Sequence, residues 1–256
     1  MLITEKQFFE ELINKKVPAM KKASELYKSG DRDSAVSTFV SYAKSIIDSD
    51  KYYNLRIAPK NLSDKNVLWS AERSVNNIFR SVGVDIDFGK DAEINWTANP
   101  TYNIYREWVY QFNRHQAWRE IGIAYRLTGD EKYAQCFERL VRSWIETAEQ
   151  CPENANGGHT LCWRTIECGI RMMSWAHAIH MCINSPSISD ETWLLIFMSM
   201  WEHCTRMRKN GSYSGNWLII EMEGMLSVCT LYGSIYADTD AWLDFALHTL
   251  EIELDN

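Results

Sequence analysis

The spacing of apolar residues constrains this chain most, because it repeats every three or four positions over nearly the whole length. Such spacing places the apolar side chains on one face of a helix. Only five prolines interrupt the pattern in 256 residues. Together with the candidate capping and stop residues, these features predict helices at 4–28, 32–48, 67–81, 103–127, 131–149, 161–184, 189–209, 215–236 and 239–254.

Two polar linkers and one loop interrupt the helices. The first linker, 49–66, carries Pro59, and the second, 82–102, is expected to be extended with room for a short strand. A loop from Cys151 to His159 joins two of the helices. Because binding groups often lie on loops that a rigid scaffold holds, these segments are candidate binding regions.

The fold class predicted from this pattern is all-α, with antiparallel helical hairpins in a closed or curved layer. We expect one helical domain over 1–256, with N-terminal helices in 1–81, a linker loop at 82–102 and central helices in 103–256. The junctions 27–35 and 125–134 look like those of helical-repeat proteins, so a protein-interaction scaffold is an alternative. Nothing similar recurs between them, which disfavours an open repeat solenoid.

The overall charge limits the classes of partner. A net charge of −7 argues against a nucleic-acid partner or an anionic membrane surface, and no uncharged apolar run is long enough to span a bilayer. An acidic ligand stays possible, since a few Arg and His side chains can set the local potential. Seven cysteines without a Cys-x-x-Cys pair are expected to be reduced and buried. We predict no cofactor, and no metal site, because His177 and His180 lack a third ligand.

The segment Ser212–Gly224 is the strongest functional signal. It places Asn216 at the start of a predicted helix, with Trp217 beside it and Glu221 just over one turn later. The N–H groups and dipole at a helix N-terminus favour a carboxylate, and an Asn amide hydrogen-bonds one without adding charge. Sugar rings also stack on Trp faces, and eleven Trp exceed what packing requires. The segment therefore predicts a pocket for an acidic sugar; the alternative is that Asn216 is an ordinary N-cap.

Four segments, taken in order, resemble the N-terminal toroid of the heparinase II/III-like polysaccharide lyases. The similarity covers about 90–256 well and the first eighty residues only by helical character. The segments are Glu93–Pro100 with its Trp, Trp108–Tyr133 with Asn113-Arg114-His115, Cys162–Arg171 with Trp163-Arg-Thr-Ile-Glu167, and Gly215–Glu221.

The resemblance implies an incomplete (α/α) toroid, normally followed by a β-sandwich domain. Such enzymes act on uronic-acid polysaccharides, of the heparin, heparan sulfate or alginate type, by β-elimination. Asn216 matches the family's carboxylate-neutralising Asn and is the implied catalytic residue. The family's catalytic Tyr and His come later, so we expect this chain to be a fragment that lacks them and the β-sandwich, with little or no activity alone. The resemblance also implies a periplasmic protein, although no secretory signal is visible.

The expected substrate contacts come from the resembling segments and the nearby loop. Structural roles compete with several of them: the His in a helix of aromatics suits a core, and Arg164 with Glu167 suits an internal ion pair. Glu221 is expected to orient Asn216 or a neighbouring Arg. An (α/α)-barrel glycoside hydrolase is a third alternative, but no facing carboxylate pair is evident. The predicted contacts are His115, Asn113, Trp96, Arg164, Glu167, Trp217, Glu221 and His159.

Overall fold

The computed structural model describes residues 2–60, 63–153 and 160–255. The chain is helical over most of its length, which confirms the predicted fold class. Short π-helical turns, η1 (Phe8–Leu12) and η2 (Tyr53–Ile57), and a 3₁₀ turn, η3 (Ala58–Lys60), extend two of the shorter helices. The α-helices are α1 (Glu5–Gln7), α2 (Pro18–Lys28), α3 (Arg32–Ser45), α4 (Ser49–Tyr52), α5 (Asp64–Val75), α6 (Arg106–Phe112), α7 (Gln116–Thr128), α8 (Glu131–Thr147), α9 (Thr165–Cys182), α10 (Asp190–Asn210), α11 (Gly215–Tyr232) and α12 (Thr239–Leu254).

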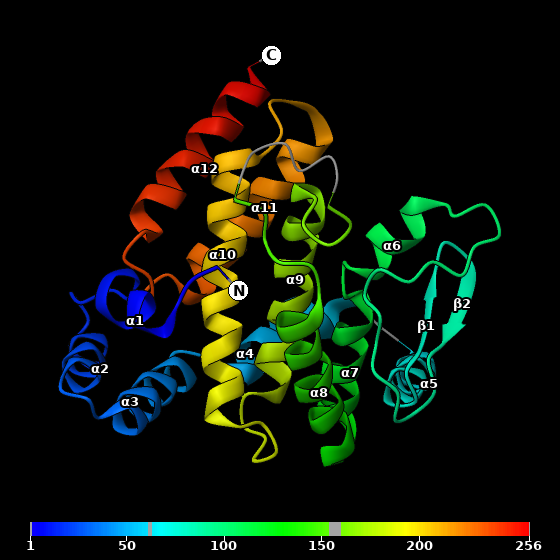
Figure 1. Ribbon diagram of the computed structural model, residues 1–256, viewed down its shortest axis with the longest axis horizontal. Coiled ribbons are helices and arrows are strands. Elements are labelled where there is room, and N and C mark those ends of the chain that lie inside the picture. Colours follow the sequence, from blue (N-terminus) through cyan, green and yellow to red (C-terminus); the bar gives the residue numbers. More distant parts are fainter. Residues whose placement is uncertain (1, 61–62, 154–159, 256) are drawn as a thin grey trace.

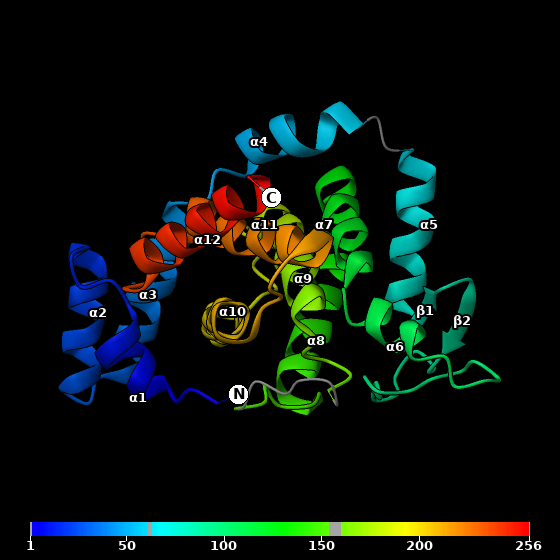
Figure 2. The same ribbon diagram turned by 90° about the horizontal axis from the view of Figure 1, so that it is seen from above.

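The helices form a curved layer. Helices α7, α8, α9 and α10 lie side by side in the middle of the molecule, and α11 packs against α9 and α12 (Figure 1). Seen from above, α2 and α3 lie at one end, α5 lies at the other, and α4 lies between them along one side (Figure 2). None of the helices that the structure describes is both long and apolar enough to cross a bilayer.

Three predicted helices are shorter than expected. The helix predicted at 4–28 is interrupted after η1, because Pro18 has no N–H to continue the ladder and instead opens α2. The helix predicted at 103–127 is interrupted between α6 and α7, where His115 takes a left-handed conformation. The helix predicted at 67–81 ends at Val75, and its last residues form a strand.

That strand, β1 (Ile78–Ser81), pairs antiparallel with β2 (Val84–Asp87). The two strands form a hairpin with Val82 and Gly83 at the turn, and β2 is the short strand expected in the second linker. Asn77 marks the change from helix to strand: its backbone has a φ of 57°, and its side-chain amide donates to the carbonyl oxygens of Gly89, Lys90 and Ala92. Alternating apolar residues and a two-residue turn are typical of a hairpin.

Most of the aromatic surplus lies in the core. Eight of the eleven tryptophans are buried, and Trp69 and Trp217 are the exposed ones. The interpretation that the Trp content exceeds what packing requires was therefore wrong for most of them, because the helices use large flat side chains to fill the space between them. All seven cysteines are buried, as expected.

A pair of glycines sets the distance between α9 and α11. A Cβ added to Gly224 would lie 2.5 Å from the Cα of Gly169 and 2.6 Å from its carbonyl oxygen. The two helix backbones therefore touch at this crossing, which no larger residue allows. This contact helps to set the N-terminal turn of α11, which carries Asn216 and Trp217, relative to Arg164 at the start of α9.

Candidate functional site

The N-terminus of α11 presents Asn216 at the surface. Ser214 is the N-cap, with extended backbone and no side-chain capping bond, and Gly215 follows with a φ of 81° that favours glycine. Asn216 is thus the second residue of the helix, and its side chain is exposed. The alternative that Asn216 is the N-cap is wrong, since Ser214 holds that position.

The first turn of α11 keeps part of its capacity to bind an anion. It contains no acidic residue. Glu253 of α12 accepts the Gly215 N–H at 2.6 Å, so one backbone donor already has a carboxylate partner. The first N–H groups of a helix have no carbonyl partner within it. The N–H groups of Asn216 and Trp217, which come next, are therefore the backbone donors that an anion can use.

Glu221 lies inside the protein. Its carboxylate accepts the Ser212 N–H at 2.7 Å and the Ser212 hydroxyl at 2.9 Å, and it is fully buried. The structure therefore contradicts the prediction that Glu221 contacts substrate or orients Asn216 directly. It anchors the segment that leads into α11, because a buried carboxylate needs such donors.

The Trp217 ring contacts the side chain of Arg164, which also contacts the ring of Tyr110. The guanidinium carbon of Arg164 lies 3.7 Å from the ring centre of Tyr110 and 4.8 Å from that of Trp217. Trp217 is still 40% exposed. Cation–π contacts of this kind orient a ring without covering both of its faces. We call Asn216, Trp217 and Arg164 the α11 site.

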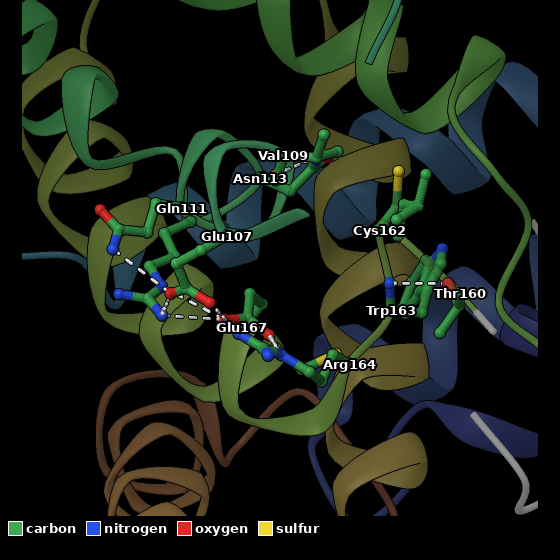
Figure 3. A network of polar contacts seen from close by, with 12 residues as sticks. Glu107, Val109, Gln111, Asn113, Thr160, Cys162, Trp163, Arg164 and Glu167 are labelled. Carbon is green, nitrogen blue, oxygen red and sulfur yellow. Dashed lines mark hydrogen bonds and ion pairs between the residues drawn. The ribbon is translucent and has the colours of Figure 1, made fainter. Parts of the chain in front are cut away.

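An ion-pair cluster between α6 and α9 supports Arg164 (Figure 3). Arg164 donates to both oxygens of Glu167, at 2.5 and 2.7 Å, and to Glu107 at 3.3 Å. Arg114 donates to Glu107 at 3.1 Å and to Glu167 at 3.0 Å. Two cations and two anions therefore balance within the cluster.

Glu167 is the buried centre of this cluster, with its side chain 0% exposed. The predicted substrate contact of Glu167 is contradicted, because both oxygens are bonded to arginines and shielded from solvent. The ion pair between Arg164 and Glu167, weighed as the structural alternative, is confirmed.

The predicted contacts did not include the residues in and just after α6 that complete the cluster. Tyr110 and Gln111 follow Glu107 by three and four positions on one face of α6, and Arg114 lies just beyond the end of that helix. That spacing was the available signal. Arg164 and Glu167, which Tyr110 and Arg114 contact, lie more than fifty residues away, so nothing local marked these contacts.

Asn113 is a structural residue. Its amide donates to the carbonyl oxygens of Trp96 at 2.9 Å and Val109 at 3.0 Å, and its oxygen accepts the Trp144 indole N–H at 2.8 Å. The side chain is 0% exposed. The predicted substrate contact of Asn113 is contradicted, because the side chain is buried and its amide groups already form these three hydrogen bonds.

His115 and Trp96 line a separate pocket of about 280 Å³. The His115 ring stacks on Trp118 with the centroids 3.8 Å apart, and its Nδ1 accepts the Trp175 indole N–H at 3.0 Å. Burial, with nearby Arg171 and His203, holds the pKa of His115 well below its usual value. The ring is therefore neutral. We call this cavity the His115 pocket.

The structure thus places the predicted contact residues at two separate sites. The α11 site and the His115 pocket are linked through Gln111, which lines the pocket and donates to Glu107 at 3.3 Å. His159, the last predicted contact, lies outside the described residues. Within the described part of the chain, no three His, Cys, Asp or Glu side chains gather as metal ligands would.

Comparison with known proteins gives one family match and several relatives. The family model described as Heparinase II/III N-terminus matches residues 8–256. A heparin-sulfate lyase of Bacteroides thetaiotaomicron is 25% identical over 271 residues, and one of Bacteroides stercoris is 20% identical over 258 residues. These alignments cover 99% and 95% of this chain, but the chain spans only 36% and 38% of the relatives' length.

Solved structures show the same architecture. A heparan sulfate lyase from Pedobacter heparinus superposes with a TM-score of 0.83 at 21% identity, over 99% of this chain and 39% of that one. A structure of heparinase III superposes with a TM-score of 0.76 at 24% identity, again over 99% and 39%. This likeness confirms the predicted incomplete helical toroid.

Proposed function

The chain belongs to the heparinase II/III N-terminus family, and from this premise we propose that it is the toroid domain of a polysaccharide lyase. The whole protein would cleave a uronic-acid polysaccharide by β-elimination. Heparin or heparan sulfate is the favoured substrate class, because the relatives are named heparin-sulfate lyases. A protein-interaction scaffold is not favoured, since the family match spans nearly the whole chain.

The chemistry explains why such an enzyme needs a hydrogen-bond donor to the sugar carboxylate that carries no charge itself. A base removes the C5 proton of the uronate, its electron pair forms the C4–C5 double bond, and the C4–O bond breaks as the leaving oxygen takes a proton. Negative charge develops next to a carboxylate during the first step. Hydrogen bonds that neutralise the carboxylate stabilise that charge.

Asn216 is the residue we assign to this role. The observation that carries the proposal is an exposed amide in the first turn of α11, which is not used as a cap. A sugar carboxylate there would accept the Asn216 side-chain N–H and the first-turn backbone N–H groups.

Trp217 is the residue we assign to sugar stacking beside Asn216. Its half-open ring offers a flat apolar face, and Arg164 holds the ring from the other side. Because Glu107 and Glu167 already balance its charge, Arg164 acts mainly as a positioning residue.

The test uses the full-length gene product and uronate polymers, with the ultraviolet absorbance of the unsaturated product as the readout. Asn216→Ala should lower kcat by about 100- to 1000-fold, the range found when one donor to a developing anion is removed. Asn66→Ala is the matched control, because Asn66 is also an exposed Asn in the first turn of a helix, α5. Absence of product from every uronate polymer tried would refute the lyase proposal, and full activity of Asn216→Ala would refute the assignment of Asn216.

A further inference from the structure

His115 carries a buried hydrogen-bond donor without an acceptor. An indole N–H only donates, so the bond from Trp175 makes His115 Nδ1 the acceptor. The proton of the neutral ring is therefore on Nε2. That atom is buried, and the described residues provide no hydrogen-bond partner for it. Buried donors are nearly always paired in native proteins, so an unpaired N–H on a residue that lines a cavity points to an acceptor that binds there.

Backbone strain is concentrated around the same cavity. His115 has a φ of 55°, and Val82, at the turn of the β1–β2 hairpin, has a φ of 42°. Both residues line the His115 pocket. A positive φ is a genuine outlier for a β-branched residue, and a turn of this kind usually holds Asn or Gly instead. Strained residues that persist tend to cluster at ligand sites.

The walls of the pocket are aromatic and amide groups. Phe79, Trp96, Phe112 and Trp118 supply the rings, and Gln111 and Gln116 supply uncharged polar groups. A volume of about 280 Å³ is several times that of one water molecule, about 30 Å³, so a single water leaves most of it empty.

The charge inside the pocket is close to zero. Among the described residues that line it, Arg80 is the charged one, and its largely exposed side chain is paired with Asp85 at 3.3 Å. His115 is neutral. An anion in this pocket would lose hydration and meet only a cation that already has an anionic partner, which is costly.

We propose that the His115 pocket is a subsite for an uncharged sugar unit of the polysaccharide whose acidic unit binds at the α11 site. A ring or hydroxyl oxygen accepts the His115 Nε2–H, and the apolar face of the sugar packs on the aromatic walls. Gln111, which lines the pocket and contacts Glu107, connects the two places along one face of α6. The inference rests on the proposed function, because it takes the ligand to be part of the same polymer.

Binding is tested on this chain with two sugars that differ only at C6, glucose and glucuronate. The His115 Nε2–H resonance, followed by ¹⁵N-edited NMR, should shift on titration with glucose and stay unchanged with glucuronate. Glucuronate should instead shift the side-chain amide signal of Asn216. An equal or larger effect of glucuronate on His115, or no effect of glucose, would overturn the proposal.

A second variant avoids removing a core residue. Ala117 lies at the pocket in the second position of α7, and Ala117→Leu fills the cavity while His115 stays in place. In the full-length protein it should raise KM about tenfold, the loss expected for one hydrogen bond with its contacts, and leave kcat nearly unchanged. Ala19→Leu is the control, because Ala19 is likewise the half-buried second residue of a helix, α2.

The two proposals fail in different ways. If the protein forms no unsaturated product from any uronate polymer, the lyase function is refuted. If product forms and Ala117→Leu has the KM of the control variant, the lyase function stands and the subsite is refuted.

Discussion

Replacing Gly224 by Ala tests how the α9–α11 crossing supports the site. The new methyl carbon would lie 2.5 Å from the Cα of Gly169, whereas non-bonded carbons prefer about 3.5–4.0 Å. The neighbours are backbone atoms, so no side chain can turn away, and α11 must move by at least about 1 Å. Overpacking of this severity costs about 3 kcal/mol, and the better helix propensity of Ala returns about 1 kcal/mol. The expected net loss is about 2 kcal/mol.

Urea unfolding of the chain, followed by circular dichroism, measures this loss. Thr230→Ala, on the exposed side of α11, is the control, because it improves helix propensity without a close contact and should stabilise by about 0.5 kcal/mol. In the full-length protein, a displacement of about 1 Å at Asn216 should lower kcat/KM by up to about 100-fold. A Gly224→Ala variant as stable as the wild type would show that the crossing is not tight and would refute the reasoning.

Three further predictions concern other groups. Glu167→Gln leaves Arg114 and Arg164 without their buried anionic partner, so it should lower the free energy of unfolding by about 3 kcal/mol. Urea titration measures this loss, and a loss smaller than that for an exposed surface ion pair would contradict the buried cluster. Trp217→Ala should raise KM for the polymer more than it lowers kcat, since stacking acts in ground and transition states alike; an effect confined to kcat would exclude simple stacking. Burial lowers the pKa of His177 and of His180 to about 4. In the unfolded chain a His has its ordinary pKa of about 6.5, so the unfolded state takes up protons at a higher pH than the folded state does. The free energy of unfolding should therefore fall as the pH drops from about 6.5 towards 4. His177→Gln should flatten that pH dependence, and an unchanged slope in unfolding free energy between pH 6.5 and 4 would count against it.

The long helices could be read from the sequence, because their apolar period is strong and their ends carry clear signals. The bounds predicted for the last four helices lie within a few residues of the observed ones. The break between α6 and α7 could not be read, because neither Pro nor Gly marks it. Asn113 ends α6 through bonds to Trp96 and Trp144, which lie far away in the sequence.

The candidate site was predictable only in part. Asn216 lies exposed in the first turn of α11, in agreement with its predicted place at a helix start. Asn113, Glu167 and Glu221 were expected at the substrate and lie buried instead, because a polar residue that satisfies a core donor looks the same in sequence as one that meets a ligand. The partners that decide between the two roles come from other helices.

The balanced cluster of Glu107, Arg114, Arg164 and Glu167 has a consequence for the encounter with the acidic polymer that we propose as the substrate. Charges that cancel over a few ångströms produce almost no field at a distance, and the chain as a whole carries a charge of −7. A net charge of this sign repels an acidic polymer at long range, in contrast to a surface with open rows of lysines. Added salt screens that repulsion, so encounter with the toroid becomes faster as ionic strength rises.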